Sequence, residues 1–150
     1  MWVPIMIKYL PGIKGDKVKG KQFIYGTLAY TMITFPLASL WHVVVFKDQY
    51  QSFNYIEGEP SFLLGLFAIL LQGFILSYLY PYVQFRGKGV IRGLKYSLLI
   101  GLFFWTSHVL AFVAKQDMNN TLLFISMESI YLLFQFGIYG LLIGIIYNDG

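Results

Sequence analysis

The sequence predicts an all-α protein that crosses a membrane four times. Of its 150 residues, 57% are hydrophobic and only 12% are charged, and the mean hydropathy is +0.64. Charged residues normally approach a quarter of a soluble globular domain. Four long stretches carry almost no charge, and each can supply the roughly 20 apolar residues that a spanning helix needs. No alternating barrel pattern is present, so backbone hydrogen bonding in lipid requires helices.

Residues 1–150 are expected to form one transmembrane domain. In chain order, the expected spans are 23–46, 61–83, 96–114 and 121–147. The third has 19 residues, which is close to the minimum length. The first is too long for a removable signal and lacks a clear small-residue cleavage site. The segment 1–21 has an apolar stretch too short to span, so we expect it to lie at the cytoplasmic interface of the membrane.

Lysine and arginine gather on one side of the expected spans. Nine of the eleven lie in the N-terminal segment or between the second and third spans. The positive-inside rule therefore places both termini in the cytoplasm. The same basic excess attracts anionic membrane lipids. No basic stripe interleaves with base-stacking aromatics, so a nucleic-acid partner is not expected.

The two halves of the chain resemble each other. His42 begins the motif HVVVF near the end of the first span, and His108 begins HVLAF near the end of the third. Gln72 and Gln135 likewise fall in the middle of the second and fourth spans. With short connections, this pattern favours an up-down-up-down four-helix bundle built from two related helical hairpins.

Three ionisable side chains within the spans are the leading site candidates. Glu128 lies about two turns into the fourth span, and His108 lies about as far before the preceding loop. An antiparallel hairpin would bring the two to the same depth, with His42 at a similar depth on another helix. A His108–Glu128 hydrogen bond could hold the hairpin together, or the group could form a proton-linked site. The histidines could instead hold b-type haem, or all three residues could hold a divalent metal.

A polar stripe continues from Glu128 along the fourth span. Tyr131, Gln135 and Tyr139 follow at helical spacing, so all four share one face. Gln72 from the second span could join them. The stripe could line a polar cavity or form hydrogen bonds across the bundle.

Small residues mark two positions of close packing. Gly140 and Gly144 form a GxxxG match, expected to pack helices inside the bundle or in a homodimer. On the third span, Gly101, Trp105 and His108 are expected to share a face. The small residues beneath Trp105 could admit a lipid tail, a quinone ring or another apolar ligand, or Trp105 could simply fill that space.

Several chemistries are excluded by what the sequence lacks. It contains no cysteine, which excludes disulfides, thiolate metal sites and cysteine nucleophiles. It also contains no GxSxG motif and no nucleotide-binding fingerprint. We therefore expect no catalytic residues, and an enzyme is the least favoured class.

Two apolar stretches carry a family resemblance. EPSFLLGLFAILLQGFILSYLYP at 59–81 and GLKYSLLIGLFFWTSHVLAF at 93–112 resemble small bacterial four-helix membrane proteins of uncharacterised function. The resemblance implies a multi-pass protein of the bacterial inner membrane. It implies no activity and no functional residue.

Together these observations predict a binding or accessory protein of the membrane. It would hold a hydrophobic ligand or cofactor near the outer face, beside His42, His108 and Glu128, or support a larger membrane complex. The second hypothesis is a small proton-linked transporter or channel, acting as a homodimer, with Glu128 and Gln135 along the path.

Overall fold

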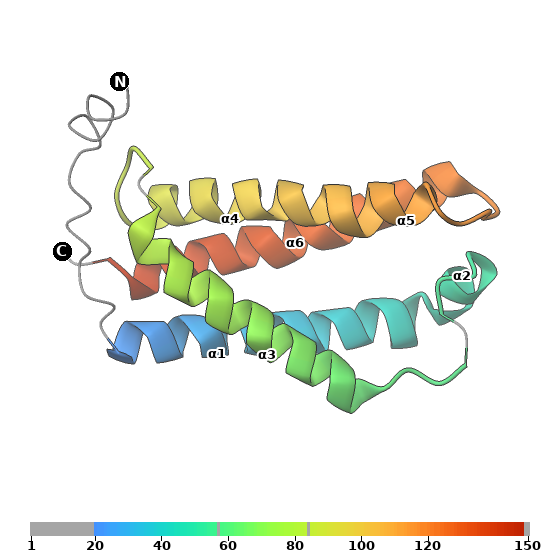
Figure 1. Ribbon diagram of the computed structural model, residues 1–150, viewed down its shortest axis with the longest axis horizontal. Coiled ribbons are helices and arrows are strands. Elements are labelled where there is room, and N and C mark those ends of the chain that lie inside the picture. Colours follow the sequence, from blue (N-terminus) through green and yellow to red (C-terminus); the bar gives the residue numbers. More distant parts are fainter. Residues whose placement is uncertain (1–19, 57, 84, 149–150) are drawn as a thin grey trace, which may run out of the picture.

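A computed structural model describes residues 20–56, 58–83 and 85–148, and every regular element in these ranges is helical (Figure 1). Four of the helices are long and apolar enough to cross a membrane, as predicted. They cover Gly20–Val45, Phe62–Tyr82, Gly89–Val113 and Thr121–Ile146. Residues 1–19 of the expected interfacial segment lie outside the described ranges.

The first and third long helices each change their winding near one end. Helix α1 (Gly20–Ala38) continues as a π-helical segment at Ser39–Val45, and the short α2 (Lys47–Ser52) follows. Helix α4 (Gly89–Trp105) continues as a π-helical segment at Thr106–Leu110, followed by α5 (Ala111–Val113). Such π-helical turns are rare in proteins, and those that occur are often at functional sites.

The other two long helices keep α-helical winding. Helix α3 (Phe62–Leu79) ends in a 3₁₀ turn at Tyr80–Tyr82, and α6 (Thr121–Ile146) runs without interruption.

The third long helix begins earlier than the expected span at 96–114. Helix α4 starts at Gly89, so Arg92 and Lys95 lie within its first two turns. Hydropathy places a span border at such charges, but long basic side chains can reach the membrane surface from inside a helix. Here Arg92 donates to the carbonyls of Tyr80 and Val83, at 3.1 Å each, beyond the end of α3.

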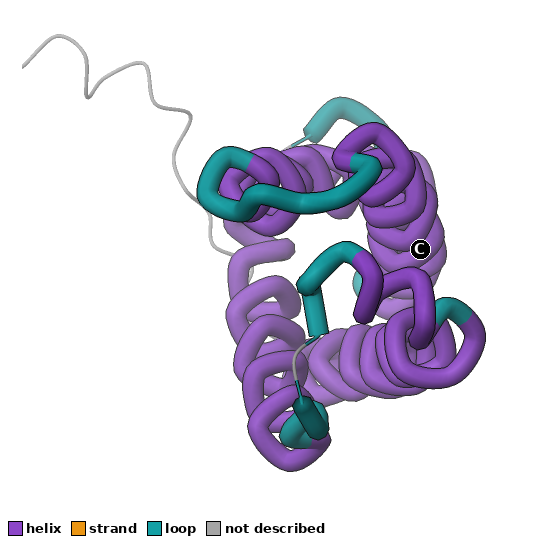
Figure 2. The backbone as a smooth tube through the Cα atoms, turned by 90° about the vertical axis from the view of Figure 1, so that its right-hand side faces the viewer, coloured by secondary structure: helices purple, strands orange, loops and turns teal. Residues whose placement is uncertain are grey.

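Helices close in sequence form two pairs. Helix α1 packs along α3, α4 packs along α6, and contacts between α1 and α6 join the pairs. In Figure 1 each long helix runs opposite to the one before it, and α2 and α5 lie at the same end of the molecule. Seen end-on in Figure 2, the long helices surround a common centre.

Most of the outer surface is apolar. Leucine, isoleucine and phenylalanine side chains are exposed along all four long helices, and only Gly73, Leu76 and Ser77 are buried in α3. Apolar surface of this extent is unfavourable in water and indicates contact with lipid. Helix α3 is therefore the long helix least embedded in the protein.

The interior is rich in tyrosine. The largest fully buried side chains include Tyr30, Tyr80, Tyr96 and Tyr139. The Tyr96 hydroxyl donates to the Leu76 carbonyl at 2.7 Å, which links α4 to α3. Interhelical hydrogen bonds of this kind help to hold helices together in lipid, because the hydrophobic effect does not drive helices to associate there.

Candidate functional site

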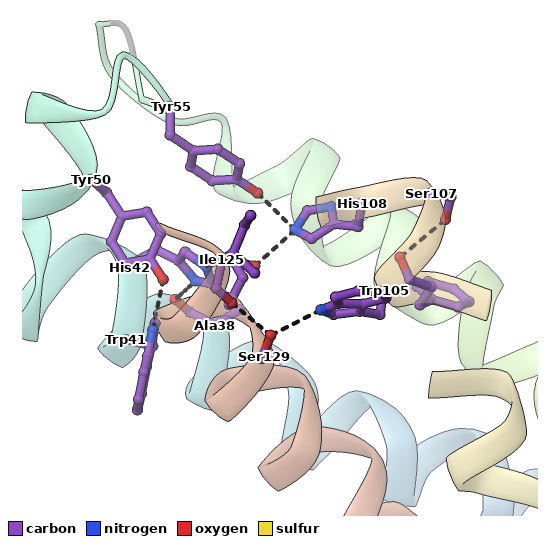
Figure 3. Close-up of polar contacts among 12 residues, drawn as sticks. Ala38, Trp41, His42, Tyr50, Tyr55, Trp105, Ser107, His108, Ile125 and Ser129 are labelled. Carbon is purple, nitrogen blue, oxygen red and sulfur yellow. Dashed lines mark hydrogen bonds and ion pairs between the residues drawn. The ribbon is translucent and has the colours of Figure 1, made fainter. Parts of the chain in front are cut away.

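The structure brings His42, His108 and Glu128 together. The His42 Nε2 lies 2.8 Å from Glu128 Oε1, and the His108 Nε2 lies 3.2 Å from Glu128 Oε2. The Glu128 side chain is completely buried. Figure 3 shows the two imidazoles directed toward one region from different helices. Each carboxylate oxygen therefore faces one histidine.

Both histidines lie in the π-helical segments. His42 is fixed from behind, because its Nδ1 donates to the Ala38 carbonyl at 3.0 Å. A carbonyl can only accept, so Nδ1 carries a proton. The His42 ring is further enclosed by Tyr50 and Tyr131, whose ring centroids lie 4.5 and 4.6 Å away.

Two tyrosines that were not among the site candidates predicted from the sequence complete the cluster. The Tyr55 hydroxyl lies 2.9 Å from His108 Nε2, and the Tyr50 hydroxyl accepts a hydrogen bond from Trp41 Nε1 at 2.8 Å (Figure 3). Tyr50 also interacts with the Glu128 carboxylate. Both tyrosines come from the chain between the first two long helices. Hydropathy gives no signal for such a fold-back.

The environment keeps these two phenols protonated. Burial, and in second place the charge of Glu128, raises the pKa of Tyr50 and of Tyr55 well above the usual value of 10.0. Each hydroxyl is therefore available as a hydrogen-bond donor at physiological pH.

The geometry gives no support to a metal or haem site. Within the ranges that the structure describes, no group of three or more His, Cys, Asp or Glu side chains is arranged to hold a metal ion. The Glu128 carboxylate lies between the imidazoles of His42 and His108. Haem b ligated by both histidines would require that carboxylate to move away.

The polar stripe on α6 faces the interior. Tyr131, Gln135 and Tyr139 are all buried. Gln135 Nε2 donates to the Tyr30 hydroxyl at 2.7 Å, and Tyr30 donates to Gln72 Oε1 at 3.0 Å. The two glutamines of the predicted repeat are thus joined through one tyrosine of α1.

A partly open cavity of about 160 Å³, called the central cavity below, is lined both by residues of this stripe and by His108 of the cluster. All four long helices line it, with Thr34, Ile69, Gln72, Phe104, His108, Tyr131, Leu132 and Gln135. Thr34 is 3% exposed, and its hydroxyl interacts with the Tyr30 side chain but makes no hydrogen bond of normal geometry. Glu128 Oε2 is likewise without such a bond. His108 is the member of the cluster nearest to solvent, with 40% of its side chain exposed. A buried hydroxyl without a hydrogen bond beside a cavity indicates room for a ligand or for water.

The prediction that Gly101, Trp105 and His108 share one face is wrong for His108. Gly101 and Trp105 line a different groove between α4 and α6, of about 200 Å³, whereas His108 lines the central cavity. The π-helical segment begins directly after Trp105 and changes the angular spacing of the residues that follow. Trp105 Nε1 donates to Ser129 Oγ at 2.9 Å and not to Glu128 (Figure 3).

The glycine motif packs inside the chain. A Cβ atom on Gly140 would lie 3.0 Å from Leu94 Cα, and one on Gly144 would lie 2.7 Å from Val90 Cα. The face formed by Gly140 and Gly144 is therefore occupied by α4. A homodimer remains a prediction, but it cannot use this motif while α4 covers it.

Comparison of the chain with family models, curated proteins and solved structures finds no match. The resemblance of 59–81 and 93–112 to small bacterial membrane proteins gains nothing from these comparisons. The function must therefore be argued from the geometry of the cavity and the cluster.

Proposed function

We propose that this protein binds a small ring-shaped hydrophobic ligand in the central cavity. The observation that carries the proposal is the buried Thr34 hydroxyl, without a hydrogen bond of normal geometry, on a cavity that also touches His108. The buried Tyr139 hydroxyl is in the same condition, but of the two only Thr34 lines this cavity.

Size and lining define the class of ligand. An engineered protein cavity of about 150 Å³ holds one benzene ring. This cavity is of that size, and Ile69, Phe104 and Leu132 supply apolar walls. Thr34, Gln72 and His108 supply hydrogen-bonding groups. One aromatic or quinone-like ring that carries oxygen substituents fits both properties.

Binding can be tested by filling the cavity. Purified protein in detergent would be titrated with 4-nitrophenol, an oxygen-substituted ring. Ile69→Trp should abolish saturable binding because the larger side chain occupies the cavity. Leu70→Trp is the matched control, because Leu70 is the next residue of α3 and is 44% exposed. Equal binding by the two variants would overturn the proposal.

A conservative substitution of Thr34 provides a second test. Thr34→Val keeps the shape of the side chain and removes the hydroxyl. We expect weaker binding of about 1 kcal/mol, the usual net value of one neutral hydrogen bond. Unchanged affinity would mean that Thr34 does not contact the ligand.

The proposal includes a membrane arrangement. We propose an up-down-up-down bundle of two related hairpins in the bacterial inner membrane, with both termini cytoplasmic and the histidine cluster toward the outer face. The distribution of lysine and arginine supports this orientation. Membrane lipids would surround the exposed apolar side chains.

One observation favours a proton-linked transporter or channel as the second candidate function. Glu128, Tyr131, Gln135 and Tyr139 form a buried polar line along α6. Proteoliposome flux of protons in the wild type and in Glu128→Gln would distinguish the functions. Leakage that the substitution does not change would count against transport.

A further inference from the structure

We infer that His108 and Glu128 accept a proton from the ligand of the central cavity, so that the ligand is a weak acid. This inference rests on the proposed function and concerns the same cavity. It begins with a count of the protons that the observed hydrogen bonds require.

The contact between His42 and Glu128 contains one proton. Nδ1 of His42 already donates to the Ala38 carbonyl. The 2.8 Å contact between His42 Nε2 and Glu128 Oε1 therefore needs one further proton, held by either atom. This side of the carboxylate is satisfied.

The contact between His108 and Glu128 lacks a proton when Tyr55 donates its hydrogen bond to His108. Tyr55, kept protonated by its surroundings, lies at hydrogen-bonding distance from His108 Nε2 and can donate to it. A nitrogen that accepts from Tyr55 carries no proton and cannot donate to Glu128 Oε2, 3.2 Å away. The contact at Oε2 is electrostatic, because this buried oxygen lies 3.2 Å from Nε2 without the geometry of a hydrogen bond. A positive charge on the His108 imidazole would therefore be stabilised by the neighbouring carboxylate.

The cavity reaches this pair of residues through His108. His108 lines the cavity, whereas Glu128 lies behind it and does not. Among the described residues, the titratable groups around the pair are His42 from the π-helical end of the first long helix, Tyr50 from α2, Tyr55 from the following loop and Tyr131 from α6. The described ion pairs of Glu128 are with the two histidines.

The proton transfer can be written completely. The O–H bond of the ligand breaks, and its proton adds to His108 Nε2. The protonated imidazole then forms an ion pair with the Glu128 carboxylate, whose Oε2 lies 3.2 Å from Nε2. The ligand keeps the electron pair as an oxyanion, and the Tyr55 hydroxyl no longer donates to Nε2. No oxidant or reductant is involved.

The test uses the colour of the same probe. The phenolate form of 4-nitrophenol absorbs in the visible, whereas the neutral phenol does not. At about pH 6, where most free probe is neutral, the wild type should produce the phenolate band on binding. Glu128→Gln and His108→Gln should each lower the bound phenolate fraction about tenfold, the factor that one unit of pKa represents. Two variants are used because a substitution at the fully buried Glu128 could impair folding, whereas His108 is partly exposed.

A methylated probe separates the two proposals. 4-Nitroanisole has no dissociable proton, so both variants should bind it as the wild type does. Saturable binding of 4-nitrophenol without a phenolate band would overturn the proton transfer and leave the cavity function standing. Absence of saturable binding of both probes to the folded wild type would overturn both.

Discussion

The contact between α4 and α6 at Gly93 permits a quantitative prediction. A Cβ atom on Gly93 would collide with the Gly140 carbonyl oxygen and lie 2.7 Å from the Gly144 Cα. These are backbone atoms, which cannot turn aside as a side chain can. Overpacking of this kind costs about 1–3 kcal/mol. Because the obstruction is rigid, we expect Gly93→Ala to fall at the upper end of that range.

A second glycine provides the matched control. Gly137 lies on α6, and a Cβ atom there would have no heavy atom within 4 Å, apart from its own helix and chain neighbours. Replacing a helical glycine by alanine stabilises by about 0.5–1 kcal/mol where nothing collides. We therefore expect Gly93→Ala to lower the free energy of unfolding by about 2 kcal/mol net, and Gly137→Ala to raise it by about 0.5 kcal/mol. The difference of about 2.5 kcal/mol corresponds to about 60-fold in the unfolding equilibrium.

Reversible unfolding in mixed detergent micelles, followed by circular dichroism, measures this difference. The free energy of unfolding of the wild type should lie between those of the two variants. If they have equal stability, α4 and α6 do not approach each other at Gly93, and the reasoning from backbone contact is refuted.

Two further predictions concern the cluster. His42→Ala should lower the free energy of unfolding by about 3 kcal/mol, because removing one partner leaves a buried carboxylate oxygen unpaired. The same unfolding assay measures this loss. A loss below about 1 kcal/mol would contradict a buried ion pair. Stability should also fall as the pH rises above about 10, because folded Tyr50 and Tyr55 keep protons that the unfolded chain releases there. Tyr55→Phe should make that decline shallower in unfolding curves recorded up to about pH 11, and an unchanged slope would show that Tyr55 does not contribute.

Hydropathy was sufficient to predict the four long helices because their length and apolar content are strong signals. It failed at the start of the third helix, since Arg92 and Lys95 interrupt the apolar pattern without ending the helix. Helical winding there is decided by backbone hydrogen bonds and by the partners of Arg92, which hydropathy does not represent.

The site was only partly predictable, for two physical reasons. Sequence spacing set the depth of His108 and Glu128, but the approach of Tyr55 depends on how the chain folds back between the first two long helices. The π-helical segments were also invisible, because their cause lies in packing as much as in local sequence. Pro36 in α1, which cannot donate a backbone hydrogen bond, is the one local feature that precedes the first of them.

The shallow burial of α3 has a consequence for how binding would be measured. Ile69 and Gln72 form the part of the cavity wall that belongs to α3. Because α3 has the fewest buried residues of the long helices, this part of the wall is the easiest to displace. A ligand that passes beside α3 arrives from the bilayer and not from water. Its apparent affinity, referred to the aqueous concentration, would then increase with its partition coefficient into lipid. Comparisons between ligands should therefore use their concentration in the membrane.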